Sequence, residues 1–508
     1  MIVITTVISF LACVALVIAS PVSADDRPNI LLLLTDDQDV TLGSFDHMPK
    51  TQKLLQEEGM TFDNAFVHTP ICCPSRSSIL SGRYLHNGAA RNNSLIGNCY
   101  GKNWKEHMET QHTYALHARR AGYTTAYAGK YLNRYGELNT TAPPGWDHWL
   151  GLVGNSRYYN YSLIEGGIGK RAKKSWHGDQ YAVDYLPNVL RNYTLEKIST
   201  MREPWLMVVA WPTPHGPFTP APWAKGTMSD YYPPMTQNYN ASDLYMRQKH
   251  WLMRQLLPMT RKTEKQVEKY YQMRLEALKS IDQHVEDMVT QLESLQQLEK
   301  TVILYTSDNG FQFGQHRLAM DKRHLYENDI RVPFCIRGPK IVPSSRSSHI
   351  VANIDIAPTI LDITTATTIS SSSTEEKASM DGTSFWSYIQ GQPDETFTKR
   401  HDLLITYHGE GQQPCGMADC PPPLHSIWWM PDSFNNTYNC VRTIRPDKED
   451  SIYCRFEDDE HFVEFYDLIK NPYQLQNDYV DLEVFERQRY ERRLQELMKC
   501  KGSTCRVQ

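Results

Sequence analysis

The chain has 508 residues, and its 53 Lys and Arg residues against 58 Asp and Glu residues leave a formal net charge of −5. This balance excludes the usual basic class of nucleic-acid-binding protein, whose affinity depends on neutralising phosphates. A hydrophobic fraction of 40% excludes a disordered or collagen-like chain, and the length excludes a single small domain.

The first 24 residues have the pattern of a signal peptide. Residues 1–18 are mostly apolar and Val22-Ser23-Ala24 resembles a signal-peptidase site, although no basic residue precedes Arg27. A signal anchor is the alternative, which the shortness of the apolar run disfavours. No later segment reaches about 18 consecutive apolar residues, so we expect no stable membrane insertion of the mature protein.

Short apolar runs alternate with helical patterns along the rest of the chain. Buried strands are predicted at residues 30–34, 125–130, 204–211 and 301–305, and an amphipathic helix at residues 263–298 leads into the last of them. This alternation predicts an α/β fold with a mainly parallel sheet. A Ser/Thr run at residues 369–374 predicts an exposed loop, and the cysteine-paired, aromatic-rich remainder predicts a smaller C-terminal α+β unit.

Acidic and amide side chains follow two of the predicted strands. Asp36 and Asp37 come after residues 30–34, and Asp308 and Asn309 come after residues 301–305. Because open α/β sheets bind ligands beyond the carboxyl ends of their strands, we expect these side chains to meet. Three carboxylates and an amide oxygen suit Ca²⁺ or Mg²⁺, and the alternative is that they cap helices and form turns.

Cationic side chains lie near other strand ends. Lys130 ends the strand at residues 125–130, His215 sits in a proline-rich loop after residues 204–211, and Lys322 lies in a charged loop. Taken singly, each is an ordinary surface or structural residue. Beside a metal ion they predict an anionic substrate, most simply a sulfate or phosphate ester.

Secretory routing is indicated by sequons and cysteines. Of the 11 cysteines, six form close pairs near the C-terminus, Cys415/Cys420, Cys440/Cys454 and Cys500/Cys505, for which we predict disulfides. N-glycosylation is predicted at six Asn-x-Ser/Thr sites: Asn92, Asn139, Asn160, Asn192, Asn240 and Asn435.

One segment of the sequence favours a sulfate ester over a phosphate ester as the substrate. Cys72-Cys73-Pro74-Ser75-Arg76, followed by a Leu-Ser-Gly-Arg run, resembles the signature of the type I sulfatases, in which a cysteine becomes formylglycine. Only Cys72 has proline two positions and arginine four positions later, so the spacing selects Cys72. Segments such as Arg27–Gly59, residues 129–133 and residues 143–146 resemble the N-acetylglucosamine-6-sulfatase branch, which acts on heparan and keratan sulfate in lysosomes.

The resemblance implies an alkaline-phosphatase-like sulfatase fold, with a large, mainly parallel sheet flanked by helices. It implies a catalytic domain at residues 25–375 and a C-terminal subdomain with an antiparallel sheet at residues 376–508. It also implies one Ca²⁺ bound by Asp36, Asp37, Asp308, Asn309 and the modified Cys72. Arg76 would hold the formylglycine hydrate, Lys130 and Lys322 would neutralise the sulfate, and His215 would protonate the leaving 6-hydroxyl.

Two positions depart from the family pattern. Many sulfatases have a histidine two residues after the catalytic lysine, where this chain has Leu132, and His177 is our candidate for that role against a structural turn histidine. The common Gly-Glu-His after the Asp-Asn-Gly motif is Gly314-Gln315-His316 here.

The implied function is removal of the 6-O-sulfate from N-acetylglucosamine 6-sulfate units, with a sulfated glycosaminoglycan as substrate and the formylglycine-generating enzyme as maturation partner. Lysosomal delivery is expected, with secretion as the alternative, and a homodimer stays open. One alternative is an extracellular heparan 6-O-endosulfatase, which is disfavoured because its long basic insertion is missing. Another is an arylsulfatase-like enzyme or a phosphate-ester hydrolase, the latter of which would use Ser or Thr in place of Cys72. The non-enzymatic alternative is a sulfated-glycan-binding protein with unmodified Cys72.

Overall fold

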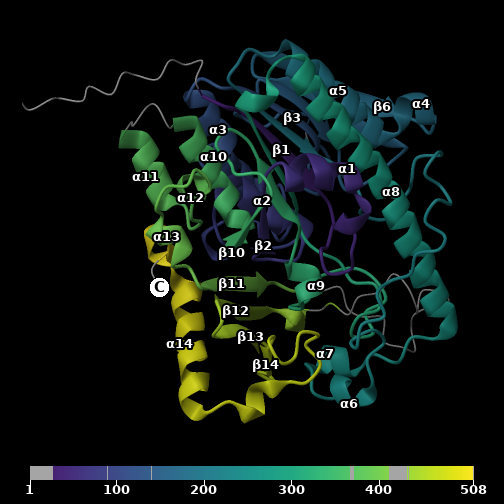
Figure 1. Ribbon diagram of the computed structural model, residues 1–508, viewed down its shortest axis with the longest axis vertical. Helices are drawn as coiled ribbons and strands as arrows, with labels where there is room; N and C mark the ends of the chain where they lie inside the picture. Colours follow the sequence, from purple (N-terminus) through teal and green to yellow (C-terminus); the bar gives the residue numbers. More distant parts are fainter. Residues whose placement is uncertain are drawn as a thin grey trace, which may run out of the picture.

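The computed structural model describes residues 27–506 apart from residues 89, 139, 366–370, 411–431 and 433. The predicted signal peptide, the Asn139 sequon and the Cys415/Cys420 pair lie outside the described residues. Within them, a large sheet with helices on both faces lies above a small C-terminal sheet (Figure 1).

The large sheet has ten strands, which in chain order are β1 (Asn29–Thr35), β2 (Met60–Phe66), β3 (Thr124–Lys130), β4 (His148–Leu152), β5 (Tyr161–Gly167), β6 (Lys170–His177), β7 (Trp205–Ala210), β8 (Thr301–Ser307), β9 (Phe334–Arg337) and β10 (Ser345–Ala352). Their spatial order is β10-β2-β9-β8-β1-β7-β3-β4-β5-β6. The central strands β8, β1, β7, β3 and β4 run parallel, whereas β9, β5 and β6 pair antiparallel with their neighbours. The predicted parallel sheet is confirmed at its centre, and the edges make the whole sheet mixed.

The central strand β1 is buried on both faces because helices cover both. Leu31 and Leu33 pack with α5 (Leu186–Thr200) and α8 (Arg261–Ser294). Ile30, Leu32 and Leu34 pack on the opposite face with α2 (Cys72–Ser81), α3 (Tyr114–Arg120) and α10 (Ile356–Thr365). Full burial of each such side chain stabilises the fold by roughly 1.5–3 kcal/mol, which explains the continuous apolar run.

The helix predicted at residues 263–298 is α8. It begins at Arg261, where the Thr260 side chain caps it by accepting a hydrogen bond from Thr263 N. Shorter helices connect the remaining elements: α1 (Pro49–Thr51), α4 (Tyr181–Asp184), α6 (Asp243–Met246), α7 (Trp251–Arg254), α9 (Glu327–Ile330), α11 (Ser371–Ser379), α12 (Trp386–Ile389) and α13 (Glu395–Thr398).

The C-terminal sheet is antiparallel and consists of β11 (Asp402–Tyr407), β12 (Tyr438–Arg445), β13 (Glu449–Phe456) and β14 (Val463–Asp467). The helix α14 (Val484–Lys499) packs against it with Tyr490, Leu494 and Leu497. The predicted disulfides Cys440–Cys454, between β12 and β13, and Cys500–Cys505 are both present. The predicted antiparallel sheet is therefore confirmed.

One local expectation is wrong. Residues 369–374 were expected to form an exposed loop, but from Ser371 onwards they belong to α11, because serine and threonine here lead into a run of helix-forming residues. The helix α11 also spans residues 375 and 376, between which the domain boundary is predicted. That boundary stays a prediction.

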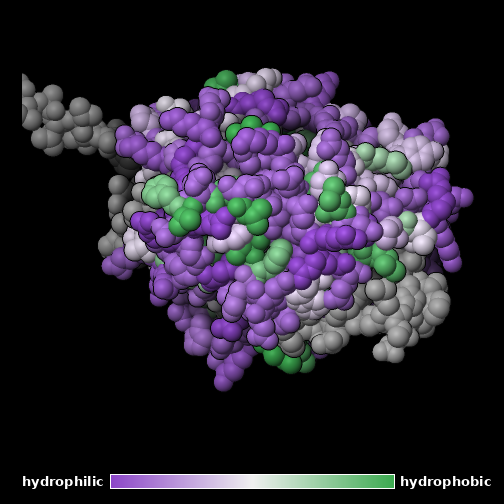
Figure 2. Space-filling view, turned by 90° about the horizontal axis from the view of Figure 1, so that it is seen from below, coloured by the Kyte–Doolittle hydropathy of each residue, from purple (hydrophilic) through white to green (hydrophobic). Residues whose placement is uncertain are grey.

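The described surface has no long apolar helix. None of the helices in the described ranges combines the length and hydropathy needed to cross a membrane. Figure 2 shows the face below the C-terminal sheet, where hydrophilic side chains dominate and hydrophobic ones form small separate patches. Such scattered exposure is ordinary for a protein surface.

Candidate active site

Polar side chains meet at the carboxyl ends of β1 and β8, which are neighbouring parallel strands. The register pairs Thr35 with Ser307, so the residues that follow leave the sheet at the same point. Asp37 N donates to Asp308 Oδ1 (3.1 Å), although 271 positions separate the two residues. Asn309 Nδ2 donates to Asp37 Oδ1 (2.7 Å). The structure thus brings the two acidic clusters together.

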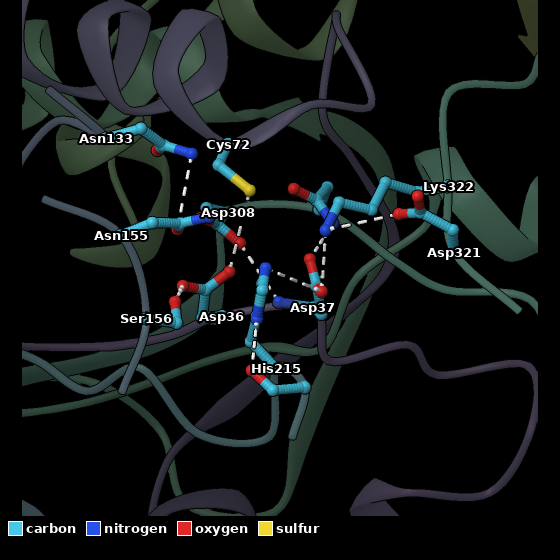
Figure 3. A network of polar contacts seen from close by, with 12 residues as sticks. Asp36, Asp37, Cys72, Asn133, Asn155, Ser156, His215, Asp308, Asp321 and Lys322 are labelled. Carbon is cyan, nitrogen blue, oxygen red and sulfur yellow. Dashed lines mark hydrogen bonds and ion pairs between the residues drawn. The ribbon is translucent and has the colours of Figure 1, made fainter. Parts of the chain in front are cut away.

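Cys72 begins α2, and its side chain points towards these acidic residues (Figure 3). Its Sγ lies 3.7 Å from Asp36 Oδ1 and is buried. The neighbouring Cys73 forms a disulfide with Cys99, which the sequence analysis missed. Of the two adjacent cysteines, only Cys72 is therefore available for modification.

As an unmodified thiol, Cys72 is a weak nucleophile. Burial raises the pKa of the thiol to about 12, and Lys130 and Lys322 oppose this shift only in part. The thiolate is the reactive form of cysteine, and it is scarce so far below the pKa. The unmodified thiol is therefore poorly suited to nucleophilic attack.

Two buried cations neutralise the acidic cluster. Arg76 shares a helix face with Cys72, four residues away, and donates from Nε to Asp308 Oδ2 (2.6 Å) and from Nη1 to Lys130 O (2.6 Å). Lys130 Nζ, at the end of β3, donates to Asp36 Oδ2. The spacing of the Cys-x-Pro-x-Arg motif thus places its cysteine and its arginine at one site.

Burial and charge act against each other on the carboxylates. Burial raises the pKa of Asp36, but Lys130, His215 and Arg76 together lower it by more than burial raises it. The Asp36 carboxylate therefore stays ionised. At Asp308 burial prevails and raises the pKa, opposed by Arg76 and reinforced by the charge of Asp36. Carboxylates crowded in this way favour a further cation in the site.

His215 and Lys322 lie on the other side of the cluster (Figure 3). Lys322 Nζ donates to Asp37 Oδ2 (2.7 Å), and His215 Nε2 lies 3.7 Å from the same oxygen. His215 Nδ1 is 2.7 Å from Gly216 O, which assigns a proton to that nitrogen and leaves Nε2 facing the site. Burial lowers the pKa of His215, and Asp37 partly opposes this.

The donor set fits a metal ion. The ligand atoms of Asp36, Asp37, Cys72 and His215 all lie within 4.8 Å of one another. Asn309 Oδ1 is buried and has no hydrogen-bond partner among the described residues. An unpaired buried acceptor costs about 1–3 kcal/mol, which coordination to a cation would remove. The cluster can therefore bind a metal, and its oxygen donors suit a hard cation.

Sequence reasoning missed three polar residues beside this cluster. Ser156 Oγ donates to Asp36 Oδ2 (2.8 Å) and accepts from Lys130 Nζ (3.0 Å). Asn133 Nδ2 donates to Asn155 Oδ1 (3.3 Å), and Figure 3 shows this pair near Cys72. Asn133 ends the segment at residues 129–133 that carries the family resemblance, but the sequence assigned it no role, and no motif marks Asn155 and Ser156. Their places shortly after β3 and β4 are the one signal that could have found them.

Residues outside the cluster hold its loops. Arg274 of α8 is fully buried and donates to Asp39 Oδ1 and Asp37 O, which braces the loop after β1. Arg323, next to Lys322, pairs with Asp321 and lies 3.4 Å from Glu410 Oε2. The segment that follows β11 therefore helps to position the Lys322 loop.

His177 makes its described contacts elsewhere. It ends β6, its ring stacks on Tyr161 with the centroids 4.9 Å apart, and its Nδ1 lies 3.6 Å from Asp184 Oδ1. Leu132, which replaces the family's histidine, is buried in the core. These contacts favour a structural role, and proton transfer by His177 stays a prediction.

The predicted glycosylation sites differ in exposure. Asn160, Asn192 and Asn435 are exposed, whereas Asn92 and Asn240 are partly buried. Asn240 Nδ2 also contacts Met259 O (3.3 Å). Glycosylation at these five positions stays a prediction.

Comparison with known proteins decides the family. A family model for sulfatases matches residues 28–366. The chain belongs to the sulfatase family. The sulfatase is 41% identical over 499 residues to N-acetylglucosamine-6-sulfatase of Capra hircus, an alignment that covers 95% of this chain and 85% of the goat protein. It is also 41% identical to human N-acetylglucosamine-6-sulfatase, covering 95% of this chain and 86% of the human protein. The resemblance drawn from the motifs is thereby confirmed.

Other relatives share less of their length or less of their sequence. The sulfatase is 41% identical over 342 residues to an extracellular sulfatase SULF-1 homolog of Drosophila melanogaster, covering 66% of this chain and 30% of that one. A solved structure bound to its substrate D-glucosamine-2-N,6-O-disulfate is 22% identical with a TM-score of 0.69, covering 93% of this chain and 98% of its own. A phosphonate monoester hydrolase of Agrobacterium radiobacter is 17% identical with a TM-score of 0.67, covering 93% and 95%. These structures confirm the predicted fold.

Proposed function

We propose that this sulfatase removes the 6-O-sulfate from N-acetylglucosamine 6-sulfate units of heparan sulfate and keratan sulfate. The observation that carries the proposal is the position of Cys72, a free buried thiol beside three carboxylates and three cations in a chain 41% identical to human N-acetylglucosamine-6-sulfatase. We further propose that Cys72 is converted to formylglycine by the formylglycine-generating enzyme, and that the metal is Ca²⁺.

Each absent group would supply one kind of chemistry. Formylglycine at position 72 supplies, as its hydrate, an oxygen nucleophile that can later release sulfate without attack of water on sulfur. Ca²⁺, held by Asp36, Asp37, Asp308 and Asn309, would polarise the sulfate oxygens. The buried carboxylates and the unpaired Asn309 Oδ1 support this assignment.

The residues of the chain divide the remaining work by position. Lys130 and Lys322 hold fixed positive charges beside Asp36 and Asp37, near enough to act on Cys72, where they stabilise negative charge that develops on the sulfate. Arg76 restrains α2 against Asp308 and the carbonyl of Lys130, so the side chain at position 72 stays beside Asp36. His215 presents Nε2 to the site, and in the imidazolium form, which the Asp37 carboxylate favours, this nitrogen is placed to give its proton to the leaving sugar oxygen.

The alternatives have less support. Phosphonate hydrolysis shares the fold, but the cysteine motif at Cys72 favours formylglycine and sulfate. The N-acetylglucosamine-6-sulfatase branch is favoured over an endosulfatase because its similarity covers 95% of this chain, whereas that to the extracellular relative covers 66%. A non-catalytic glycan-binding protein would have no need of a modification signal. The signal-peptide pattern and the sequons support a secretory route, for which we propose the lysosome as destination, with secretion as the alternative.

The proposal is tested by mass spectrometry of protein from a eukaryotic secretory pathway. After reduction and alkylation, the tryptic peptide Leu54–Arg76 should carry an aldehyde or its hydrate at Cys72 and an alkylated Cys73. The same preparation should release sulfate from N-acetylglucosamine 6-sulfate but not from 4-sulfated N-acetylgalactosamine. Sulfate release by protein with unmodified Cys72 would contradict the mechanism, and no release by the modified protein would contradict the substrate.

A further inference from the structure

A groove leads away from the active site at Ser156. It has a volume of about 800 Å³, and its walls include the segment from Val153 to Ser162, which runs from the loop after β4 into β5, Trp176 of β6, and Pro217 and Thr219 after His215. Ser156 contacts both Lys130 and Asp36, so the groove and the sulfate site share a wall. Parts of a substrate that extend beyond the reacting sugar can therefore enter this groove.

The groove carries unpaired positive charge. Arg157 is exposed at the groove, and none of the ion pairs or hydrogen bonds among the described residues involves its side chain. Lys174 lies two residues before Trp176, on the same face of β6. The acidic groove residue Glu137 is already within 3.4 Å of Arg134. The free charge in the groove is thus positive, which attracts an anionic ligand.

The groove also offers an aromatic surface. Trp176 is 67% exposed, which is a large exposed area for a tryptophan, and it lines the groove together with Tyr159. The pairing of β5 with β6 places Trp176 opposite Ser162, another groove residue. An indole with one free face can pack against the apolar face of a sugar ring. Exposed apolar area of this kind commonly marks a binding site.

We propose that this groove binds the sugar that adjoins the reacting residue in a sulfated glycan chain. Arg157 pairs with the carboxylate or sulfate of that sugar, and Trp176 packs against its ring. The inference rests on the proposed function, because it assigns a place to the rest of the same substrate. It makes the enzyme prefer an anionic oligosaccharide over the single 6-sulfated sugar.

The experiment compares kcat/KM for two substrates. One is N-acetylglucosamine 6-sulfate, and the other is an oligosaccharide that carries the same residue at its non-reducing end, followed by a uronate. In Arg157→Ala and in Trp176→Ala the ratio of oligosaccharide to monosaccharide kcat/KM should fall about tenfold, mainly through KM. The ratio in Arg157→Ala should also become less sensitive to salt, because an ion pair has been removed.

Two further variants sharpen the test. Lys173→Ala removes the same charge from the opposite face of β6 and should keep the wild-type ratio. Arg157→Lys keeps the charge and should restore part of the ratio. The proposal is overturned if the ratio is unchanged in both groove variants, or if both substrates lose kcat/KM equally, since that indicates a structural role. If the wild-type enzyme turns over neither substrate, the proposed function itself fails, an outcome distinct from loss of the groove preference alone.

Discussion

Cys72 Sγ lies 3.7 Å from Asp36 Oδ1, although 36 positions separate the two residues in the chain. Asp36 follows the central strand β1, and Cys72 begins a helix that packs over the same sheet. A group formed on the side chain of Cys72 therefore stays beside the carboxylates proposed to bind Ca²⁺. Three consequences of this arrangement can be measured, and so can the effect of a buried histidine, His68, that contacts α2.

Replacement of Cys72 should abolish turnover. Cys72→Ala leaves no side chain from which formylglycine can be formed, and we expect sulfate release to fall by roughly 10³-fold or more, as after loss of a nucleophile in other hydrolases. The matched control is Cys335→Ala, because Cys335 on β9 is the other free buried cysteine of the described residues. It should retain turnover with a modest stability loss of about 1 kcal/mol. Equal activity in the two variants would contradict the role of Cys72.

Replacement of His215 should slow substrates that have a poor leaving group. A general acid contributes about 10²–10⁴-fold, so His215→Gln should lose that much on the sugar 6-sulfate. The loss should be much smaller on a nitrophenyl sulfate, whose phenolate leaves without a proton. Kinetics with both substrates provide the measurement. The same two substrates applied to His177→Gln test whether His177 transfers a proton. A loss of activity confined to the sugar substrate would assign that role to His177.

Removal of Ca²⁺ should lower both activity and the melting temperature. Without the metal ion, the repulsion among the buried carboxylates of Asp36, Asp37 and Asp308 is offset only by their side-chain partners Arg76, Lys130 and Lys322. A ligand present at 100 times its Kd stabilises the folded state by about 2.7 kcal/mol. Thermal unfolding with chelator, with Ca²⁺ and with Mg²⁺ tests this. Asn309→Ala should require more Ca²⁺ for the same shift. Asn188→Ala, which removes a contact to His284 instead, should respond to Ca²⁺ as the wild type does. A melting temperature independent of Ca²⁺ would contradict the metal site.

The free energy of unfolding should decrease as the pH falls from 6.5 towards 4, in part because of His68. Burial lowers the pKa of His68 to about 4, opposed by its hydrogen bond to Asn353. Between about pH 6.5 and pH 4 the unfolded chain therefore binds more protons than the folded chain. The stability contributed by the neutral His68 is fully present above about pH 6.5 and is lost as the pH falls from 6.5 to 4. The loss amounts to about 3 kcal/mol by pH 4.

Urea unfolding from pH 4 to pH 8 measures this effect. His68→Gln cannot take up the proton and should have a shallower pH slope than the wild type. His107→Gln, at an exposed histidine, should follow the wild-type curve. Parallel curves for His68→Gln and the wild type would show that His68 is not the group responsible.

The central fold and the residues that meet at the site could be predicted from the amino-acid sequence alone. The apolar run at residues 30–34 identifies a strand buried on both faces, because such a strand needs apolar side chains at every position. The cysteine motif identifies Cys72 and Arg76 through its resemblance to the sulfatase signature, and their four-residue spacing places both on one face of a helix. The acidic residues after β1 and β8 were expected to meet because parallel neighbours end at the same edge of a sheet.

Which other residues reach that edge depends on how the folded chain packs. Ser156 contacts Asp36, Asn133 contacts Asn155, and Arg274 contacts the backbone of Asp37. These contacts join separate loops and a helix, and no periodic pattern marks the residues that make them. The Cys73–Cys99 disulfide likewise depends on how two loops pack. Local sequence patterns report the environment of a residue and the spacing of its neighbours, whereas contacts between distant loops follow from the packing of the whole chain. The chemistry could therefore be predicted from motifs, while the groove and the contacts that hold the site had to come from the fold.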